Sequence, residues 1–380
     1  MDFDFTDEQE QLRDAVRKWV DKAYGFERRR GIVKEGGYSK EAWGEMAELG
    51  LMGLAVPEEH GGMGFGPVEA MVVMEELGRG IVLEPYAGVA LVAAGLLARH
   101  APAETQSQWL PRIAGGEALV VLAHQEREAR YMLQHVTTTA RSQGGAWAVS
   151  GAKSIVPVGD VADAYIVPAR VSGAVDAPEG IALFLVERGA SGVSTQGYPL
   201  QDGARGAEVQ FRDAPATLLV GPEGGLAALE WAADVAIAAQ CAEAVGTMDK
   251  LFALTVEYLN TRKQFGVPIG TFQALRHRVA DMKMQLELAR SMSYYATLKL
   301  GEEPLLRRRA LSQAKVQIGQ SMRFVGQQSV QLHGGIGVTD EYVGAHYFKR
   351  LTCLEMSFGD TLHHLGEVSA RMQDTAGVFA

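Results

Sequence analysis

The sequence holds little cysteine, no long apolar run and a deficit of positive charge, and each shortage excludes a class of protein. Two cysteines, Cys241 and Cys353, are too few for a disulfide framework and lack partners at metal-ligand spacing, so we expect buried apolar side chains and no metal. No apolar stretch reaches the length of a membrane span, so we expect no membrane insertion. The formal net charge of -10 argues against nucleic acid as a partner, because phosphate binding needs a basic surface.

The N-terminal segment, residues 1–8, is acidic where a secretory signal or an import peptide would be basic. We therefore expect the chain to stay in the cytoplasm. With 380 residues and a hydrophobic fraction of 47%, the chain can bury a large core and divide into two or three structural regions.

The periodicity of apolar residues changes twice along the chain. Residues 6–9 read as a capping box, and helical spacing follows to about residue 115. From about 119 to 221, short apolar or alternating runs separated by turn-rich pieces predict strands, with 172–180 as a hairpin loop. The pattern predicts an α-helical domain over 1–118, an all-β domain over 119–221 and a helical bundle over 222–380.

In the last region, six apolar residues at near-heptad spacing predict one face of a long helix. They are Leu275, Val279, Met282, Leu286, Ala289 and Ala296.

A turn between two predicted helices carries residues suited to a phosphate-bearing cofactor. Its sequence is Arg262-Lys-Gln-Phe265-Gly-Val-Pro-Ile-Gly-Thr-Phe-Gln273. Two readings fit the residue types equally: a binding site, or ordinary helix-ending punctuation by Gly266 and Pro268 with an arginine favoured by the helix dipole.

The order of specified residues in that turn resembles the signature of the acyl-CoA dehydrogenase family, FAD-dependent flavoenzymes that oxidise acyl-CoA thioesters. Two further segments are similar to the family and come in its order: 50–79, with Pro57-Glu58 and Glu75-Glu76, and 331–342, Gln331-Leu-His-Gly-Gly-Ile-Gly-Val-Thr-Asp-Glu-Tyr342. The resemblance implies a mainly α fold with a central β-barrel: an α-helical N-terminal domain, the barrel, and a C-terminal four-helix bundle that also supplies the oligomer contacts.

The glycines at 334, 335 and 337 do not mark a Rossmann site, because they follow a helical pattern rather than a strand. By residue type they end that helix. The resemblance additionally implies FAD contacts, at the pyrophosphate for Gln331, Gly334 and Gly335, and across a subunit interface for Arg262, Phe265 and Gln273.

In the resembling family, a carboxylate removes a proton from Cα of the thioester while a hydride leaves Cβ for the flavin. The family's aromatic-Glu-Gly-Thr segment corresponds here to Phe358-Gly359-Asp360-Thr361, so the glutamate position holds Gly359. The alternative base position of the isovaleryl and long-chain branches falls at Ala236. Both usual bases are missing, while Thr361 keeps its place as an expected flavin contact.

Three sources for the base remain open. Glu243 lies seven residues after Ala236 and projects from about the same helical face. Asp360 is next to the missing glutamate, but it fits a capping role equally well. The third source is another chain.

The β region departs from the family as well. Gln125-Glu126-Arg127 stands where the family has Thr-Glu-Pro beside the flavin, and we expect Gln125 and Glu126 to contact it. An aromatic-x-Thr pair becomes Ile155-Val-Pro157. With His363-His364, which we interpret as capping rather than metal-binding, these departures resemble the branch of small subunits of pimeloyl-CoA dehydrogenases and of heteromeric steroid side-chain acyl-CoA dehydrogenases.

The leading hypothesis is an FAD-dependent acyl-CoA dehydrogenase subunit that forms a 2,3-enoyl-CoA and passes electrons to an electron-transferring flavoprotein, as a homo-oligomer or a heterotetramer. A second is a non-catalytic subunit that completes FAD sites in a heterotetramer with a catalytic paralogue. A third is a flavin oxidase or monooxygenase on the same fold.

Overall fold

The computed structural model describes residues 4–372 and forms two compact units. The bundle unit contains residues up to 28, 67–82 and those from 237 onward, and the barrel unit contains 29–66 and 83–236. The first helical region of the sequence thus contributes to both units. The domain boundaries at 118 and 221 stay a prediction.

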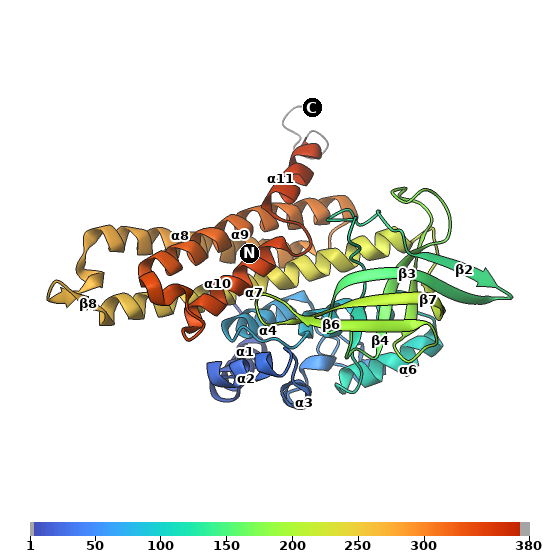
Figure 1. Cartoon of the computed structure of the whole chain (residues 1–380), viewed down its shortest axis with the longest axis horizontal. Coiled ribbons are helices and arrows are strands. Elements are labelled where there is room, and N and C mark those ends of the chain that lie inside the picture. Colours follow the sequence, from blue (N-terminus) through green and yellow to red (C-terminus); the bar gives the residue numbers. More distant parts are fainter. Residues whose placement is uncertain (1–3, 373–380) are drawn as a thin grey trace. The chain divides into compact units, whose positions relative to one another are not determined.

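Long helices build the bundle unit (Figure 1). They are α1 (Asp7–Ala23), α4 (Pro67–Arg79), α7 (Gly225–Thr261, which begins in the barrel unit), α8 (Gln273–Lys299), α9 (Pro304–His333), α10 (Val343–Met356) and α11 (Thr361–Ala370). The expected capping box at the start of α1 is confirmed: Thr6 Oγ1 accepts from the Gln9 amide at 3.2 Å, and the Gln9 side chain accepts from the Thr6 amide. These bonds satisfy amides that the helix leaves without partners.

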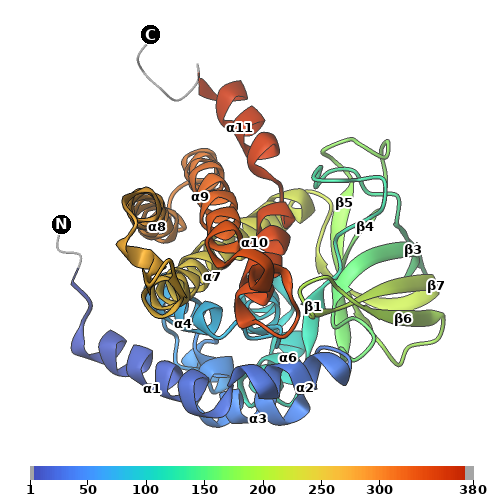
Figure 2. The same cartoon turned by 60° about the vertical axis from the view of Figure 1, so that its left-hand side comes forward.

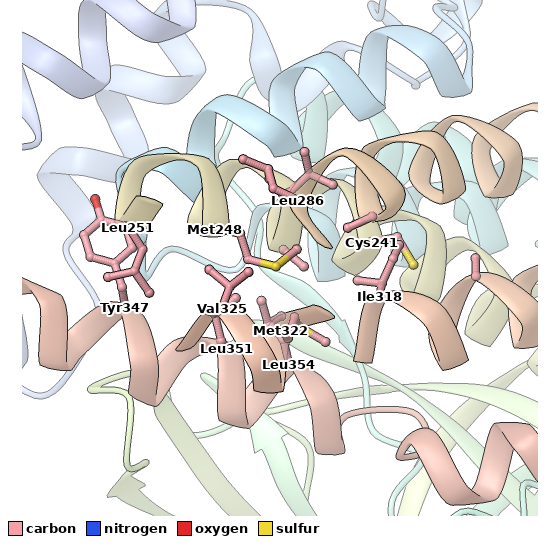
Figure 3. Packing of buried hydrophobic residues seen from close by; sticks show 14 of the residues in the cluster. Cys241, Met248, Leu251, Leu286, Ile318, Met322, Val325, Tyr347, Leu351 and Leu354 are labelled. Carbon is pink, nitrogen blue, oxygen red and sulfur yellow. The ribbon is translucent and has the colours of Figure 1, made fainter. Parts of the chain in front are cut away.

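The core of the bundle unit lies between α7, α8, α9 and α10, which Figure 2 shows nearly end-on. The predicted face of α8 is confirmed, since Met282, Leu286 and Ala289 are fully buried. Figure 3 shows side chains of the facing helices pointing toward one another, among them Met248, Leu286, Ile318, Leu351 and Leu354.

The two cysteines differ in their surroundings. Cys241 is buried in this core, as expected (Figure 3). The expectation was wrong for Cys353, which is only partly buried on α10.

The barrel unit holds a sheet of seven strands. They are β1 (Val120–Leu122), β2 (Thr139–Gln143), β3 (Ala146–Pro157), β4 (Ala164–Arg170), β5 (Ile181–Glu187), β6 (Val193–Pro199) and β7 (Arg205–Val220). The pairing β4–β2–β3–β7–β5 closes on itself through β4–β5, with β1 and β6 attached at its rim. The expected loop at 172–180 joins the antiparallel strands β4 and β5. The predicted fold class, mainly α with a β-barrel, is confirmed.

Shorter helices complete the barrel unit. They are α2 (Phe26–Lys34, which starts in the bundle unit), α3 (Lys40–Glu48), η1 (Leu51–Gly53), η2 (Glu58–His60), the π-helix η3 (Ala87–Ala93), α5 (Ala94–His100) and α6 (Ala103–Ala114). No helix within residues 4–372 is long and apolar enough to span a membrane.

Candidate functional site

The turn after α7 is a small exposed hairpin. Strands β8 (Lys263–Gln264) and β9 (Val267–Pro268) pair antiparallel, and η4 (Ile269–Thr271) leads into α8. Phe265 is 92% exposed and has a φ of +53°, a strained conformation for a bulky residue. Arg262 and Gln273 at the two ends of the hairpin are exposed as well. The hairpin therefore presents a cation, an aromatic ring and an amide outward.

The end of α9 offers accessible backbone. Gly334 ends the helix with a φ of +65° and begins the 3₁₀ turn η5 (Gly334–Val338). Gly334, Gly335 and Gln331 are exposed. A Cβ added at either glycine would meet no atom within 4 Å, so a ligand can approach the main chain there. The glycines therefore both end the helix, as expected from residue type, and leave a surface that fits a cofactor.

The hairpin and the glycine turn belong to the same end of the bundle unit. The ring of Tyr258, four residues before Arg262, lies 4.5 Å from the ring of His333, which directly precedes Gly334. One turn earlier, Thr255 Oγ1 and Ser329 Oγ are 2.9 Å apart and join α7 to α9. Two of the segments expected to contact FAD are thus brought together by α7 and α9.

The loop between α10 and α11 is held by side chains from other helices. Lys315 of α9 donates to two carbonyl oxygens at the end of α10, at 2.5 and 2.8 Å. His364 Nε2 lies 2.9 Å from the Phe358 carbonyl oxygen and is the donor, because a carbonyl only accepts. Phe358 and Gly359 have consecutive positive φ values of +55° and +108°. The surrounding bonds hold this loop in a conformation that is unfavourable on its own.

The glutamate position of the family is closed in this loop. A Cβ at Gly359 would lie 2.5 Å from His363 Cδ2 and 2.6 Å from His364 Nε2, distances that Cβ contacts essentially never show. Asp360 is the N-cap of α11, where its Oδ1 accepts from the His363 amide at 2.8 Å. Thr361 is buried and donates its amide and hydroxyl to Glu355, at 3.0 and 2.7 Å.

Glu243 is engaged in an ion pair. Glu243 is buried, with 5% of its surface exposed, and its Oε1 lies 2.5 Å from Nε of Arg350 on α10. Its backbone carbonyl lies against Gly78 of α4, so the helix is tightly packed at this point. Glu243 as the base stays a prediction, but its carboxylate has the surroundings of a structural ion pair.

Two buried groups beside the α10–α11 loop have perturbed proton affinities. Burial lowers the pKa of Lys315 to about 8, against the opposing influence of Cys241, Glu355 and Asp360. Burial, followed by the charge of Lys315, lowers the pKa of His364 to about 3. At neutral pH the ring of His364 is therefore neutral, with one nitrogen donating to Phe358.

In the barrel unit, Glu126 is saturated with hydrogen bonds. It accepts from the Lys153 ammonium at 2.7 Å and from the amides and hydroxyls of Thr137 and Thr138. Burial alone would raise the pKa of Glu126, but Lys153 and Thr137 lower it to about 2. The Glu126 carboxylate is therefore fully engaged within the barrel unit, and the Gln125 side-chain amide donates to the Arg130 carbonyl oxygen at 2.8 Å.

The sequence reasoning missed Lys315, Glu355 and Arg350. Only Lys315 left a usable signal, as a lysine among the core-facing positions of α9 between Leu311 and Ile318. Nothing in the sequence shows that it serves the α10–α11 loop. Within residues 4–372, no three His, Cys, Asp or Glu side chains gather as a metal site.

The fold and these segments define an acyl-CoA dehydrogenase architecture. Residues 6–117, 122–214 and 223–373 match the models of the acyl-CoA dehydrogenase N-terminal, middle and C-terminal domains. The chain therefore belongs to the acyl-CoA dehydrogenase family and is an FAD-dependent oxidoreductase.

Individual relatives agree with this assignment. The chain is 32% identical to acyl-CoA dehydrogenase FadE12 of Mycobacterium tuberculosis over 89% of its own length and 88% of that protein. A chain of the ChsE4–ChsE5 complex of the same organism superposes with a TM-score of 0.88 at 26% identity, covering 99% of this chain and 100% of that one. A chain of a Tcur3481–Tcur3483 steroid ACAD variant also gives 0.88, at 29% identity, covering 97% and 99%.

Proposed function

We propose that the chain is one subunit of an FAD-dependent acyl-CoA dehydrogenase built from two different chains, which oxidises a CoA thioester to its 2,3-enoyl-CoA. The reduced flavin would pass its electrons to an electron-transferring flavoprotein. In this proposal, the related second chain supplies the catalytic carboxylate.

The proposal depends on what occupies and surrounds the four positions at which a catalytic base is expected. Gly359 is closed by the rings of His363 and His364. Ala236 has no acid function, Asp360 caps a helix and Glu243 is paired with Arg350. A general base needs a carboxylate free to reach the substrate proton, so the capping role of Asp360 and the ion pair of Glu243 support a base supplied by another chain. The similar ChsE4–ChsE5 complex and Tcur3481–Tcur3483 steroid ACAD variant are each named for two proteins, which supports a two-chain enzyme.

The cofactor contacts belong to the proposal as well. We assign the Arg262 guanidinium to the FAD diphosphate, because a charge-assisted bond suits an exposed cation at this position. The open backbone of Gly334 and Gly335 would approach the same group, beside Gln331. Phe265 and Gln273 would contact FAD from the hairpin, Gln125 and the Glu126 backbone from the barrel, and Thr361 from the α10–α11 loop. When bound, FAD accepts the hydride that leaves Cβ of the thioester.

The test compares the chain alone with the assembled enzyme. The tagged chain, isolated from its own cells, should carry a second acyl-CoA dehydrogenase chain with a carboxylate at the base position. That pair should bleach its flavin anaerobically with an acyl-CoA, whereas this chain alone, supplied with FAD, should not.

Bleaching by the chain alone would overturn the two-chain proposal and identify a self-sufficient dehydrogenase. Rapid reoxidation of the reduced pair by air would instead favour the oxidase reading. A series of CoA thioesters, from short straight chains to steroid side chains, would then define the substrate.

A further inference from the structure

His333 lies between two aromatic side chains that belong to different segments of the bundle unit. Its ring is 4.5 Å from that of Tyr258 on α7 and 4.9 Å from that of Tyr342, which follows η5. His333 itself is 4% exposed. The His333 ring therefore packs between Tyr258, which lies one turn before the Arg262 hairpin, and Tyr342, which ends the segment that begins at Gly334.

The hydrogen bonds of His333 fix its tautomer. Nδ1 lies 2.8 Å from the carbonyl oxygen of Ser329, so this nitrogen carries the hydrogen, and the Leu254 backbone is a further partner of the ring. Nε2 of the neutral ring is then an acceptor, and the Tyr342 hydroxyl donates to it at 2.8 Å. Burial lowers the pKa of His333, and burial raises the pKa of Tyr342 to about 12, so both groups stay in these protonation states at neutral pH.

Tyr342 closes the turn that His333 opens. The segment 334–341 between them is largely exposed. Within it, the amide and hydroxyl of Thr339 donate to the Ile336 carbonyl oxygen, and Lys349 and His346 of α10 donate to Asp340 near its end. The side-chain bond between residues 333 and 342 therefore limits how far this segment can spread. On the other side, Tyr258 accepts the Arg262 amide at its carbonyl oxygen, 2.8 Å away, so its position sets the start of the hairpin.

We propose that His333 is a positioning residue that holds the glycine turn 334–341 and the Arg262 hairpin in one geometry for the FAD diphosphate. This inference rests on the proposed cofactor site. His333 contacts the cofactor through neither nitrogen, since Ser329 and Tyr342 occupy both. It acts by keeping the open backbone of one segment and the cation of the other in register, which lowers the ordering cost of binding.

Three full-length variants test the inference. Tyr342→Phe removes only the hydroxyl that closes the turn, and His333→Asn also removes the ring that contacts Tyr258. Tyr347→Phe is the matched control, because it removes the hydroxyl of a buried tyrosine in the same unit that donates to the Arg79 carbonyl oxygen, which belongs to neither segment.

Amide hydrogen exchange of the apoprotein gives a readout that needs no cofactor. Tyr342→Phe should speed exchange in 334–341 alone, His333→Asn in both 334–341 and 262–272, and Tyr347→Phe in neither. FAD titration should show affinity about 3- to 10-fold weaker for Tyr342→Phe, the usual effect of losing one hydrogen bond. The double variant that combines Tyr342→Phe with His333→Asn should bind FAD as tightly as His333→Asn alone, because both changes break the same hydrogen bond.

Parent-like exchange of 262–272 in His333→Asn would overturn the inference, as would an FAD affinity that Tyr342→Phe leaves unchanged. If His333→Asn does not fold, Tyr342→Phe still decides whether the turn depends on this bond. If the parent chain binds no FAD in any assembly, the proposed cofactor site is wrong. The exchange pattern would still test whether His333 holds the two segments together.

Discussion

Single residues of this chain are placed in ways that separate cofactor binding from acid–base chemistry. The groups assigned to FAD in the bundle unit, Arg262, Phe265 and Gln273 among them, are exposed and have room for a ligand. The carboxylates near the expected base position, Glu243 and Asp360, are tied into an ion pair and a helix cap. These contacts support a role in binding FAD, and they do not leave either carboxylate free to remove a proton from the substrate.

Glu243→Gln separates a structural role from a catalytic one. If the carboxylate mainly pairs with Arg350, the substitution should lower the free energy of unfolding by on the order of 1.5–3 kcal/mol, the value of a hydrogen bond to a charged group. Anaerobic flavin bleaching in the assembled enzyme should keep the parent rate. A loss of ~10²-fold or more would identify Glu243 as the base after all. Asp360→Asn, which keeps a capping side chain, serves as the control and should change neither quantity.

Arg262→Ala should weaken FAD binding without weakening the fold. A charge-assisted contact contributes about 1.5–3 kcal/mol, which corresponds to roughly a 10- to 150-fold higher Kd, whereas an exposed arginine adds little stability. The check is FAD titration together with the melting temperature of the apoprotein. Lys283→Ala removes another exposed cation, one paired with Glu287 on α8, and should leave the Kd unchanged.

At the scale of elements, side chains of three helices constrain the α10–α11 loop. His364 of α11 donates to the carbonyl oxygen of the left-handed residue Phe358. On either side, Lys315 of α9 donates to Ser357 and Glu355 of α10 accepts from the amide of Thr361. Lys315 and His333 lie on the same helix, 18 residues apart, which is about five turns or ~27 Å. This separation supports an assembly in which the loop and the glycine turn of one chain serve different cofactor sites.

Gly359→Ala tests how tightly the loop is determined. The new methyl group would meet His363 and His364 and would also adopt a φ of +108°, so we expect a fall in melting temperature corresponding to ~1–3 kcal/mol. Gly366→Ala is the matched control in α11, where an added Cβ meets nothing within 4 Å. There alanine should raise the melting temperature slightly, because it favours the helix. Equal behaviour of the two variants would show that the loop adapts.

His364 gives the loop a predictable pH dependence. Burial, followed by the charge of Lys315, lowers the pKa of His364 from 6.5 to about 3. Between these pH values the histidine is protonated in the unfolded chain and neutral in the folded chain. The free energy of unfolding therefore falls as the pH drops below 6.5, by about 2 kcal/mol at pH ~5. In urea unfolding at about pH 7.5 and about pH 5, His364→Gln should lose roughly 2 kcal/mol less than the parent. His277→Gln, at an exposed position, should follow the parent.

At the scale of the whole molecule, several large apolar side chains are exposed in the described part of the bundle unit. Besides Phe265, helix α8 carries an outward stripe at helical spacing. Its members are Met284, Leu288, Tyr295 and Leu298. This surface supports the expectation that chains associate through the helical bundle.

We expect an oligomer of two or four chains in solution, because the proposed cofactor site would be completed across a subunit interface, as the resemblance to the family implies. Light scattering on the flavin-loaded protein measures the mass directly. A stable, flavin-loaded monomer at micromolar concentration would contradict this prediction and the shared cofactor site with it.

The family, the fold class and most of the local elements could be predicted from the amino-acid sequence. The capping box at Thr6, the apolar face of α8 and the helix end at His333 depend on neighbours within a few residues, so local chemistry was enough to predict them. Strands β2 (Thr-Ala-Arg-Ser-Gln) and β6 (Val-Ser-Thr-Gln-Gly-Tyr-Pro) contain few apolar residues, so their sequences give a weak strand signal. Their pairing with β3 and β7 stabilises them.

The contacts of the site residues depend on long-range packing, which the sequence does not show. The Glu243–Arg350 pair spans 107 positions, and the bonds of Lys315 to the α10–α11 loop span about 40. The closure of the Gly359 position depends on a backbone conformation and on two rings that follow it. Contacts of this kind leave no periodic signal, since any of several polar residues at either end could have formed them. The identity of Gly359 was thus visible in the sequence, and its closure to a side chain was visible only in the fold.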